Sequence, residues 1–442
     1  MSTAAVTPAQ IAPKPVGHWF EDMALTRRHW AAGFALFIAF VIESWEMMII
    51  IYSSGAIATD FGLSTGQTGS LIGAIFLGMI PGALLWGKLM GVWGRRTCLL
   101  ISIGAYTMFP LLSAVAPTFE ILLAIRFACG VVLAGALVVT FPYFTELVPV
   151  KMRGRATVYL SAGWPLGVLI AVGVTIALQD QGWRWVVGFS SVAGLWALVI
   201  ASIVPESPYW LAEKGRAKEA EDAIRQLSMQ KIQPVISPTD QATAGKMPFS
   251  RIFSGPRLKV TVVQTIINFC FSWGYWGLAS WMPALLAERG LSAPQGLGFI
   301  ALSALFMFPG YICASFLTGR FGRRRVLLTF VFFSAVCGMG FAYSDSMTQM
   351  YGWNFGLSFF MLGGWGVWNT WLSEIYDTPS RGAGTAWGVS AQRVANAIAP
   401  VVIGAMLATS TFGQTVLFIT AFLAITFIAA LFLKEMEGKP LS

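Results

Sequence analysis

Residues 81–96 read PGALLWGKLMGVWGRR, and residues 309–324 read PGYICASFLTGRFGRR. The two segments lie 228 positions apart, and each begins with Pro-Gly and ends with Gly-Arg-Arg. Two further matches have the same offset, namely Glu146 with Glu374 and Arg153-Gly154 with Arg381-Gly382. Several matches at one offset indicate an internal repeat, so we expect two structurally related halves.

The apolar residues around these segments occur in long runs. Of the 442 residues, 56% are hydrophobic and 11% are charged, whereas a typical soluble domain has about 25% charged residues. A run of about 20 apolar residues crosses a hydrocarbon core about 30 Å thick as a helix. Strands of a β-barrel would instead alternate over about ten residues.

We therefore expect an all-α membrane protein with twelve transmembrane helices in two pseudo-symmetric six-helix bundles. The expected spans lie near residues 30–58, 68–88, 97–115, 119–143, 156–178, 184–204, 258–286, 296–318, 326–343, 348–373, 382–408 and 412–433.

The positive charges fix the expected orientation. With the N-terminus in the cytoplasm, 25 of the 29 Lys and Arg residues lie on cytoplasmic segments. Arg184 and Arg289 lie outside, and Arg126 and Arg393 lie within spans. This asymmetry follows the positive-inside rule. We expect a multi-pass protein of a bacterial inner membrane with both termini in the cytoplasm.

The polar segments divide the chain into regions. Ser207 and Pro208 are suited to the start of a helix, and the charged, amphipathic segment from Leu211 to Leu227 predicts a short surface helix. Residues 231–250 are typical of a flexible linker. The expected regions are a cytoplasmic tail (1–29), a six-helix bundle (30–204), a cytoplasmic linker (205–257), a second bundle (258–433) and a cytoplasmic tail (434–442).

Several functional classes are disfavoured. The net charge of +9 is explained by the cytoplasmic loops, and no basic helix with interleaved aromatics predicts nucleic-acid binding. The five cysteines form neither a CxxC pair nor a cluster with histidine, so no metal site is predicted. The sequence lacks a phosphate-binding loop and a nucleophile–base constellation. We expect no enzyme activity and no cofactor, and a monomer whose partners are lipid and a small molecule.

Four charged residues lie well inside the expected spans, away from their ends: Glu43, Glu46, Arg126 and Arg393. A charged side chain at a helix centre costs about 2.5–3.5 kcal/mol on insertion scales, so its retention indicates a task. Glu43 and Glu46 are three residues apart and share a helix face. The helical rise of about 1.5 Å per residue places them at depths that overlap with Arg126. An ion pair with Arg126 is therefore expected, as a structural salt bridge or as a proton site.

The proton site is the favoured interpretation of Glu43, Glu46 and Arg126. Burial favours the neutral form of a carboxyl group, whereas a neighbouring arginine favours the charged form. Two acids beside one arginine do not both stay ionised easily, so one is expected to exchange a proton, the coupling ion. Glu46, the acid nearer the outside, is narrowly favoured as the carrier.

Arg393 lies near the midplane, and its expected counter-ion is Glu43, Glu46 or the substrate. A guanidinium group is suited to a carboxylate, so substrate binding is favoured over a structural role. Aromatic faces and a few polar groups would suit a flat organic anion. The further candidates are Gln264, Asn268, Trp276, Trp368, Asn369 and Gln392, each weighed against helix–helix hydrogen bonding or interfacial anchoring.

Three motifs resemble the major facilitator superfamily. Residues 87–96 resemble its signature loop between the second and third helices, with Gly91 where the family usually has an acid. Residues 126–130, RFACG, resemble its fourth-helix motif. Residues 205–211, PESPYWL, resemble its sugar-porter-like branch, which includes organic-ion carriers.

Within that branch, metabolite:proton symporters for aromatic acids and nicotinate have two acids, usually aspartates, at the spacing of Glu43 and Glu46. These organic-anion carriers also have an arginine at the position that Arg393 has here. The resemblance therefore implies a secondary transporter that works by alternating access between two halves.

The repeated charges at the cytoplasmic ends of the helices are expected to hold a cytoplasmic gate. They are Glu146 with Arg153, Glu374 with Arg381, and Arg95 and Arg323 of the repeated loop.

Taken together, these observations predict proton-coupled uptake of a small organic anion, an aromatic or heteroaromatic carboxylate. A sugar:proton symporter is one alternative, although sugars require no buried cation. Drug or metabolite efflux is another, although hydrophobic cations do not match Arg393. A membrane receptor without net transport also stays open.

Overall fold

The structure is a computed structural model that describes residues 13–21, 23–236, 249–372, 375–376 and 378–433. Long helices account for nearly all of the described residues, and an isolated bridge between Lys14 and Ile236 is the extent of the β-structure assigned within them. The all-α class expected from the sequence is confirmed.

The first half contains ten α-helical segments and three short 3₁₀ turns before the linker. They are α1 (Val16–Trp19), α2 (Arg27–Phe61), α3 (Thr65–Trp93), α4 (Arg95–Tyr106), α5 (Met108–Ala114), α6 (Phe119–Leu147), η1 (Val150–Met152), α7 (Arg153–Ser161), α8 (Gly163–Leu178), η2 (Gln179–Gln181), α9 (Trp183–Phe189), η3 (Ser190–Leu195) and α10 (Trp196–Ile203).

The linker and the second half follow. They contain α11 (Pro208–Glu213), α12 (Ala217–Leu227), η4 (Phe249–Phe253), α13 (Pro256–Glu288), α14 (Ala293–Phe321), α15 (Arg323–Ala342), α16 (Met347–Leu372), α17 (Thr378–Leu407) and α18 (Phe412–Ala430).

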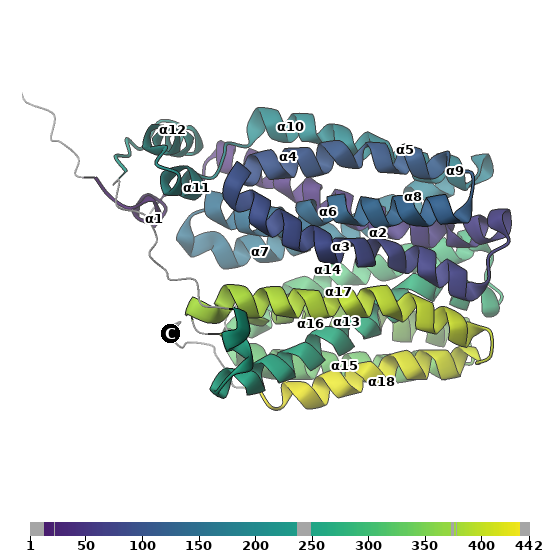
Figure 1. The fold of residues 1–442 in the computed structure, drawn as a ribbon. Coiled ribbons are helices and arrows are strands. Elements are labelled where there is room, and N and C mark those ends of the chain that lie inside the picture. The colour runs from purple at the N-terminus through teal and green to yellow at the C-terminus, as the bar shows by residue number, and fades with distance from the viewer. Residues whose placement is uncertain (1–12, 22, 237–248, 373–374, 377, 434–442) are drawn as a thin grey trace, which may run out of the picture.

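Ten helical stretches of the described chain are long and apolar enough to cross a membrane. Several join neighbouring helices, such as α4 with α5, α7 with α8, and α9 with α10. Helices α13 and α16 are comparably long and run alongside the others (Figure 1). Counted with them, the long helices of the described chain are consistent with the twelve spans expected.

The repeat seen in the sequence is also present in the backbone. Gly94 and Gly322 separate the second span of each half from the third, and both have positive φ, 92° and 83°. This conformation is accessible to glycine at little cost. Pro81 and Pro309 lie inside α3 and α14 at equivalent places.

The two halves lie one above the other in Figure 1, with α3 of the first half beside α17 of the second. Helix α8 packs against α14 in the same interface. Glycines allow the closest approach, since a Cβ atom at Gly69 would collide with the Pro400 backbone, and one at Gly73 would lie 2.5 Å from the Ala397 carbonyl oxygen. The halves therefore meet tightly at the ends of α3 and α17 expected to face outward.

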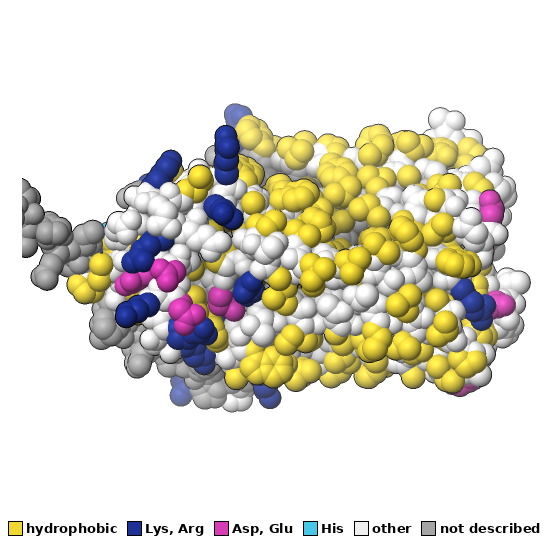
Figure 2. Space-filling view, turned by 90° about the horizontal axis from the view of Figure 1, so that it is seen from above, with side chains coloured by type: hydrophobic (Ala, Val, Ile, Leu, Met, Phe, Trp, Pro, Cys, Tyr) yellow, Lys and Arg dark blue, Asp and Glu magenta, His cyan; other side chains and the backbone are white. Residues whose placement is uncertain are grey.

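The opposite end carries α1, α11 and α12; it is called the cytoplasmic end below, after the orientation expected from the positive charges. Figure 2 shows many Lys, Arg, Asp and Glu side chains at this end and a long apolar surface beside it. The N-terminal segment is attached there, because Thr26 Oγ1 donates to the Leu227 carbonyl oxygen over 2.5 Å and the Val150 amide donates to the Phe20 carbonyl oxygen over 3.0 Å.

The linker differs from the expected single surface helix between Leu211 and Leu227. Ser207 caps the start of α11, as predicted, by accepting a hydrogen bond from the Trp210 amide. The helix then ends at Glu213, and α12 begins at Ala217. The break lies at Gly215, whose positive φ of 73° is incompatible with a continuous right-handed helix.

Candidate functional site

Glu46 lies in a closed hydrogen-bonded cluster inside the first half. Its Oε2 accepts a 2.6 Å hydrogen bond from the Tyr106 hydroxyl of α4, and its Oε1 accepts one from Arg126 Nη1 of α6. Cys129 Sγ lies 3.8 Å from the same Oε1. Glu46 and Arg126 are both fully buried. This cluster connects α2, α4 and α6, and both carboxylate oxygens are occupied.

Glu43, one turn earlier on α2, is in a different environment. It is 1% exposed, and its Oε2 has no hydrogen-bond partner in the described part of the chain. The charge that acts on it is Arg393 of α17, in the opposite half. Between these two described residues no salt bridge within 4 Å is formed. Glu43 and Arg393 therefore interact electrostatically across the interface without forming a salt bridge.

The expectation that both acids flank Arg126 is wrong for Glu43. Three residues turn an α-helix by about 300°, so side chains at this spacing diverge by about 60° around the axis. That divergence directs Glu46 toward α4 and α6, and Glu43 toward the second half.

Arg393 is buried at the interface, with 7% of its surface exposed. Its guanidinium group makes no hydrogen bond or salt bridge to any described residue, while the nearby Asn396 is fully engaged. With its amide oriented to satisfy both partners, Asn396 accepts from Trp276 Nε1 over 3.1 Å and donates to the Gln392 carbonyl oxygen over 2.8 Å. Arg393 is therefore a buried cation without a direct anionic partner among the described residues.

Aromatic side chains from both halves meet beside this position. The rings of Phe76 and Trp276 are 4.4 Å apart between centroids, and those of Trp164 and Trp276 are 5.6 Å apart, edge to face. Trp164 Nε1 donates a 2.6 Å hydrogen bond to the Tyr275 hydroxyl. We call Phe76, Trp164, Tyr275 and Trp276 the aromatic cluster. It lies on α3, α8 and α13, so it crosses the interface.

The sequence indicated Trp276 but missed Phe76 and Trp164. Ser44 Oγ, next to Glu43, donates to the Trp164 carbonyl oxygen over 2.8 Å and so holds α8 against α2. The sequence feature that could have indicated Trp164 is Gly167. In the structure, a Cβ atom at Gly167 would lie 2.6 Å from the Val41 carbonyl oxygen. A small residue one turn from a tryptophan marks a close helix contact.

The polar candidates of the second half bond mainly to one another. Asn268 Oδ1 accepts from Trp368 Nε1 over 2.9 Å and from Gln392 Nε2 over 2.6 Å. Asn268 Nδ2 donates to the Gln264 carbonyl oxygen over 2.8 Å. This network connects α13, α16 and α17, and it positions the residue next to Arg393. Asn369 is half-buried, and its side chain forms no hydrogen bond with the described residues.

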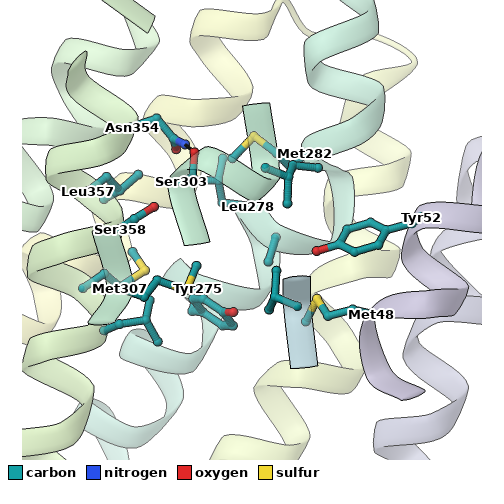
Figure 3. A pocket seen from close by; sticks show the side chains of 15 residues that line it. Met48, Tyr52, Tyr275, Leu278, Met282, Ser303, Met307, Asn354, Leu357 and Ser358 are labelled. Carbon is teal, nitrogen blue, oxygen red and sulfur yellow. Dashed lines mark hydrogen bonds between the residues drawn. The ribbon is translucent and has the colours of Figure 1, made fainter. Parts of the chain in front are cut away.

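A cavity of about 60 Å³ lies between the halves on the outer side of the cluster. Figure 3 shows Met48 and Tyr52 of α2 on one side of the space, and Met307 and Ser358 on the other. Tyr275 borders both the cavity and the aromatic cluster. Ligand pockets usually measure about 300–1,000 Å³, so this space is large enough for a few water molecules and too small for an organic anion.

The charges at the cytoplasmic end are arranged differently from the expected pairs. Glu146 forms a 3.0 Å salt bridge with Arg95, and not with Arg153. Arg153 Nη2 donates instead to the Tyr209 hydroxyl over 2.7 Å. Both contacts lie within the first half and its linker.

The remaining residues of the expected gate belong to the second half. Arg323 begins α15 in the position that Arg95 has in α4. Glu374 and the side chain of Arg381 lie outside the described residues.

The chain resembles a known family of membrane transporters and several of its members in sequence. The family model described as Major Facilitator Superfamily matches residues 34–370 and 301–441. The chain is 28% identical over 427 residues to the niacin transporter NiaP of Acinetobacter baylyi, covering 95% of this chain and 97% of that protein. It is 27% identical to the 4-hydroxybenzoate transporter PcaK of the same organism, covering 70% of each.

The structural comparison shows the same fold in a sugar transporter. The proton:xylose symporter XylE bound to 6-bromo-6-deoxy-D-glucose has a TM-score of 0.75 and 20% identity, covering 95% of this chain and 98% of that one. The partially occluded inward-open form of XylE from E. coli also has a TM-score of 0.75, with 18% identity.

Proposed function

Since the chain belongs to the major facilitator superfamily, we propose that it imports a small aromatic or heteroaromatic carboxylate together with a proton. The protein is a multi-pass membrane transporter and not an enzyme. The names of its relatives, a niacin and a 4-hydroxybenzoate transporter, support an aromatic acid as the substrate.

Arg393 carries the proposal. A buried cation without a direct partner is costly, because its desolvation is not repaid. A substrate carboxylate would supply a direct counter-charge and two hydrogen bonds to the planar guanidinium group. The aromatic cluster lies next to Asn396, one turn along α17, and would contact the faces and edges of the substrate ring.

Glu43 is the proton site in this proposal, in place of Glu46. Both oxygens of Glu46 are bonded within the first half, whereas one oxygen of Glu43 has no hydrogen bond, and the charge that acts on this group is Arg393 of the other half. The acid that exchanges a proton must be able to lose its charge without breaking a buried salt bridge, and Glu43 satisfies this condition.

The charges explain how proton and substrate would be coupled. The empty site contains Glu43⁻ and Arg393⁺, and the fully loaded site contains neutral Glu43, Arg393⁺ and the carboxylate. Both states have no net charge. A site loaded with only the proton or only the anion has one uncompensated charge, which is costly in a closed interior. The halves would therefore rock readily only when the site is empty or fully loaded.

Uptake into proteoliposomes tests the proposal. Labelled nicotinate, 4-hydroxybenzoate and xylose are offered with the lumen more alkaline than the outside. We expect faster uptake of an aromatic acid with the gradient than without it. Losing a buried charged partner costs about 2 kcal/mol or more, so Arg393→Gln should reduce uptake roughly 30-fold or more.

Arg184→Gln is the matched control, because this arginine is exposed and pairs with Asp60 at the surface. It should transport like the unaltered protein. Acid uptake that ignores the pH gradient would remove the coupling. Uptake of xylose that Arg393→Gln leaves intact, with no acid uptake, would establish the sugar alternative instead.

A further inference from the structure

A second hollow lies on the lipid-facing side of the molecule, away from the proposed substrate site. It is a groove of about 630 Å³ between α3, α6 and α17. Leu77, Phe127 and Ile398 line it and are 53%, 39% and 42% exposed. Apart from Ser70 and Glu120 its lining is apolar. Because the three helices are membrane spans, the molecules that reach this groove are lipids.

The depth of the groove matches one leaflet. It extends from Ser70 to Leu77, which lie about 8 and 18 Å from the outer start of α3 at a rise of about 1.5 Å per residue. On α17 it lies between Ala397 and Val402, about 15 to 8 Å from the helix end at Leu407. Half of a hydrocarbon core about 30 Å thick is about 15 Å. The groove therefore lies in the outer leaflet and ends near the midplane.

The outer rim of the groove carries an unpaired negative charge. Glu120 lies in the first turn of α6, and its side chain is exposed. Within the described residues no Lys, Arg or His forms an ion pair with it. An acid at the level of the lipid headgroups attracts a headgroup with an ammonium group and repels a purely anionic one.

We propose that this groove binds an outer-leaflet phospholipid with an ammonium headgroup, with one acyl chain between α3, α6 and α17 and the ammonium group at Glu120. This inference does not depend on the identity of the transported substrate.

The bound lipid has a conformational consequence. Two walls of the groove belong to the first half and one to the second. The same α3 and α17 meet tightly at Gly69 and Gly73. Separating their outer ends would take the groove apart, so a lipid that binds the intact groove stabilises the arrangement closed to the outside.

Photolabelling tests the proposal. The full-length protein is placed in nanodiscs with phospholipids whose acyl chains carry a diazirine and whose headgroup is phosphoethanolamine or phosphoglycerol. Labelled peptides are identified by mass spectrometry. One favourable charge at the membrane surface is worth about fivefold in binding, so segments 70–77, 120–127 and 397–402 should be labelled about five times more by the ethanolamine lipid.

Three variants separate the parts of the proposal. Glu120→Gln should remove the headgroup preference, whereas Asp180→Asn, an exposed acid away from the groove, should keep it. Ala124→Trp fills the groove from an exposed position and should reduce labelling of α3 and α17, while labelling near Ile312 on the lipid-facing side of α14 stays constant.

Equal labelling by both headgroups in the unaltered protein would overturn the proposal. A groove labelled no more than the surface around Ile312 would also overturn it, because the lipid there would be ordinary bilayer lipid. A headgroup preference that survives in Glu120→Gln would remove the assigned role of Glu120.

Discussion

Glu46 and Glu43 are three residues apart on α2, and both are buried, but their surroundings differ in one essential respect. Glu46 is bonded to Arg126 and Tyr106 within a single half. Glu43 interacts electrostatically with Arg393 of the other half and has one unbonded oxygen. A carboxylate whose two oxygens both accept hydrogen bonds holds helices together, whereas a carboxylate without a salt bridge can change its charge during a transport cycle. We infer that, within one turn of α2, Glu46 stabilises the first half and Glu43 couples proton and substrate movement.

The largest expected difference is in stability, between Arg126→Gln and Arg393→Gln. Breaking a buried ion pair leaves Glu46 as an uncompensated charge and costs about 3–5 kcal/mol. Arg393 has no bonded partner among the described residues, and Glu43, which it would leave behind, can take up a proton and become neutral in this account, so Arg393→Gln should melt close to the unaltered protein. Thermal melting of the purified protein, followed by tryptophan fluorescence, measures both. Equal losses of melting temperature in the two variants would contradict the proposed difference between the surroundings of Glu46 and Glu43.

Tyr106→Phe should have an intermediate effect. It removes the 2.6 Å hydrogen bond to the Glu46 carboxylate, and a hydrogen bond to a charged group contributes about 1.5–3 kcal/mol. Tyr311→Phe is the control, because Tyr311 is also buried and its hydroxyl has no hydrogen bond to the described residues. In the same melting assay, the account predicts a loss for Tyr106→Phe only. The folded fraction should retain its response to the pH gradient.

Trp164→Phe should have the smallest effect on stability and a clear one on transport. It keeps an aromatic ring but removes the hydrogen bond to Tyr275, worth about 0.5–1.5 kcal/mol. Trp185→Phe, at a 68% exposed position, controls for the loss of a tryptophan. Uptake by Trp164→Phe should fall roughly two- to tenfold. Unchanged uptake would place the aromatic cluster outside the substrate path.

The helical architecture could be predicted from the sequence because every membrane span must be long, apolar and helical. Long apolar runs, the distribution of Lys and Arg, and the offset of 228 residues between Gly94 and Gly322 are properties of the chain itself. The structure shows the same turn, with positive φ, at both glycines. The four buried charges were found for the same reason, since any charge within a span is conspicuous.

The pairing of those charges required the structure. The spacing of Glu43 and Glu46 defines a shared face, but which helices lie against each edge of that face depends on packing between distant segments. Tyr106 and Trp164 were missed because their roles depend on that packing. Arg95 was expected in the gate, but its contact with Glu146, in place of Arg153, depends on how α4 meets α6.

Proton movement that accompanies substrate entry tests the central claim most directly. Proteoliposomes containing a pH-sensitive dye are given an aromatic acid, and Glu43→Gln is compared with Glu46→Gln at equal amounts of folded protein. We predict that Glu43→Gln exchanges substrate across the membrane without moving protons, while Glu46→Gln still moves protons with substrate. Proton movement that persists in Glu43→Gln and disappears in Glu46→Gln would contradict the account.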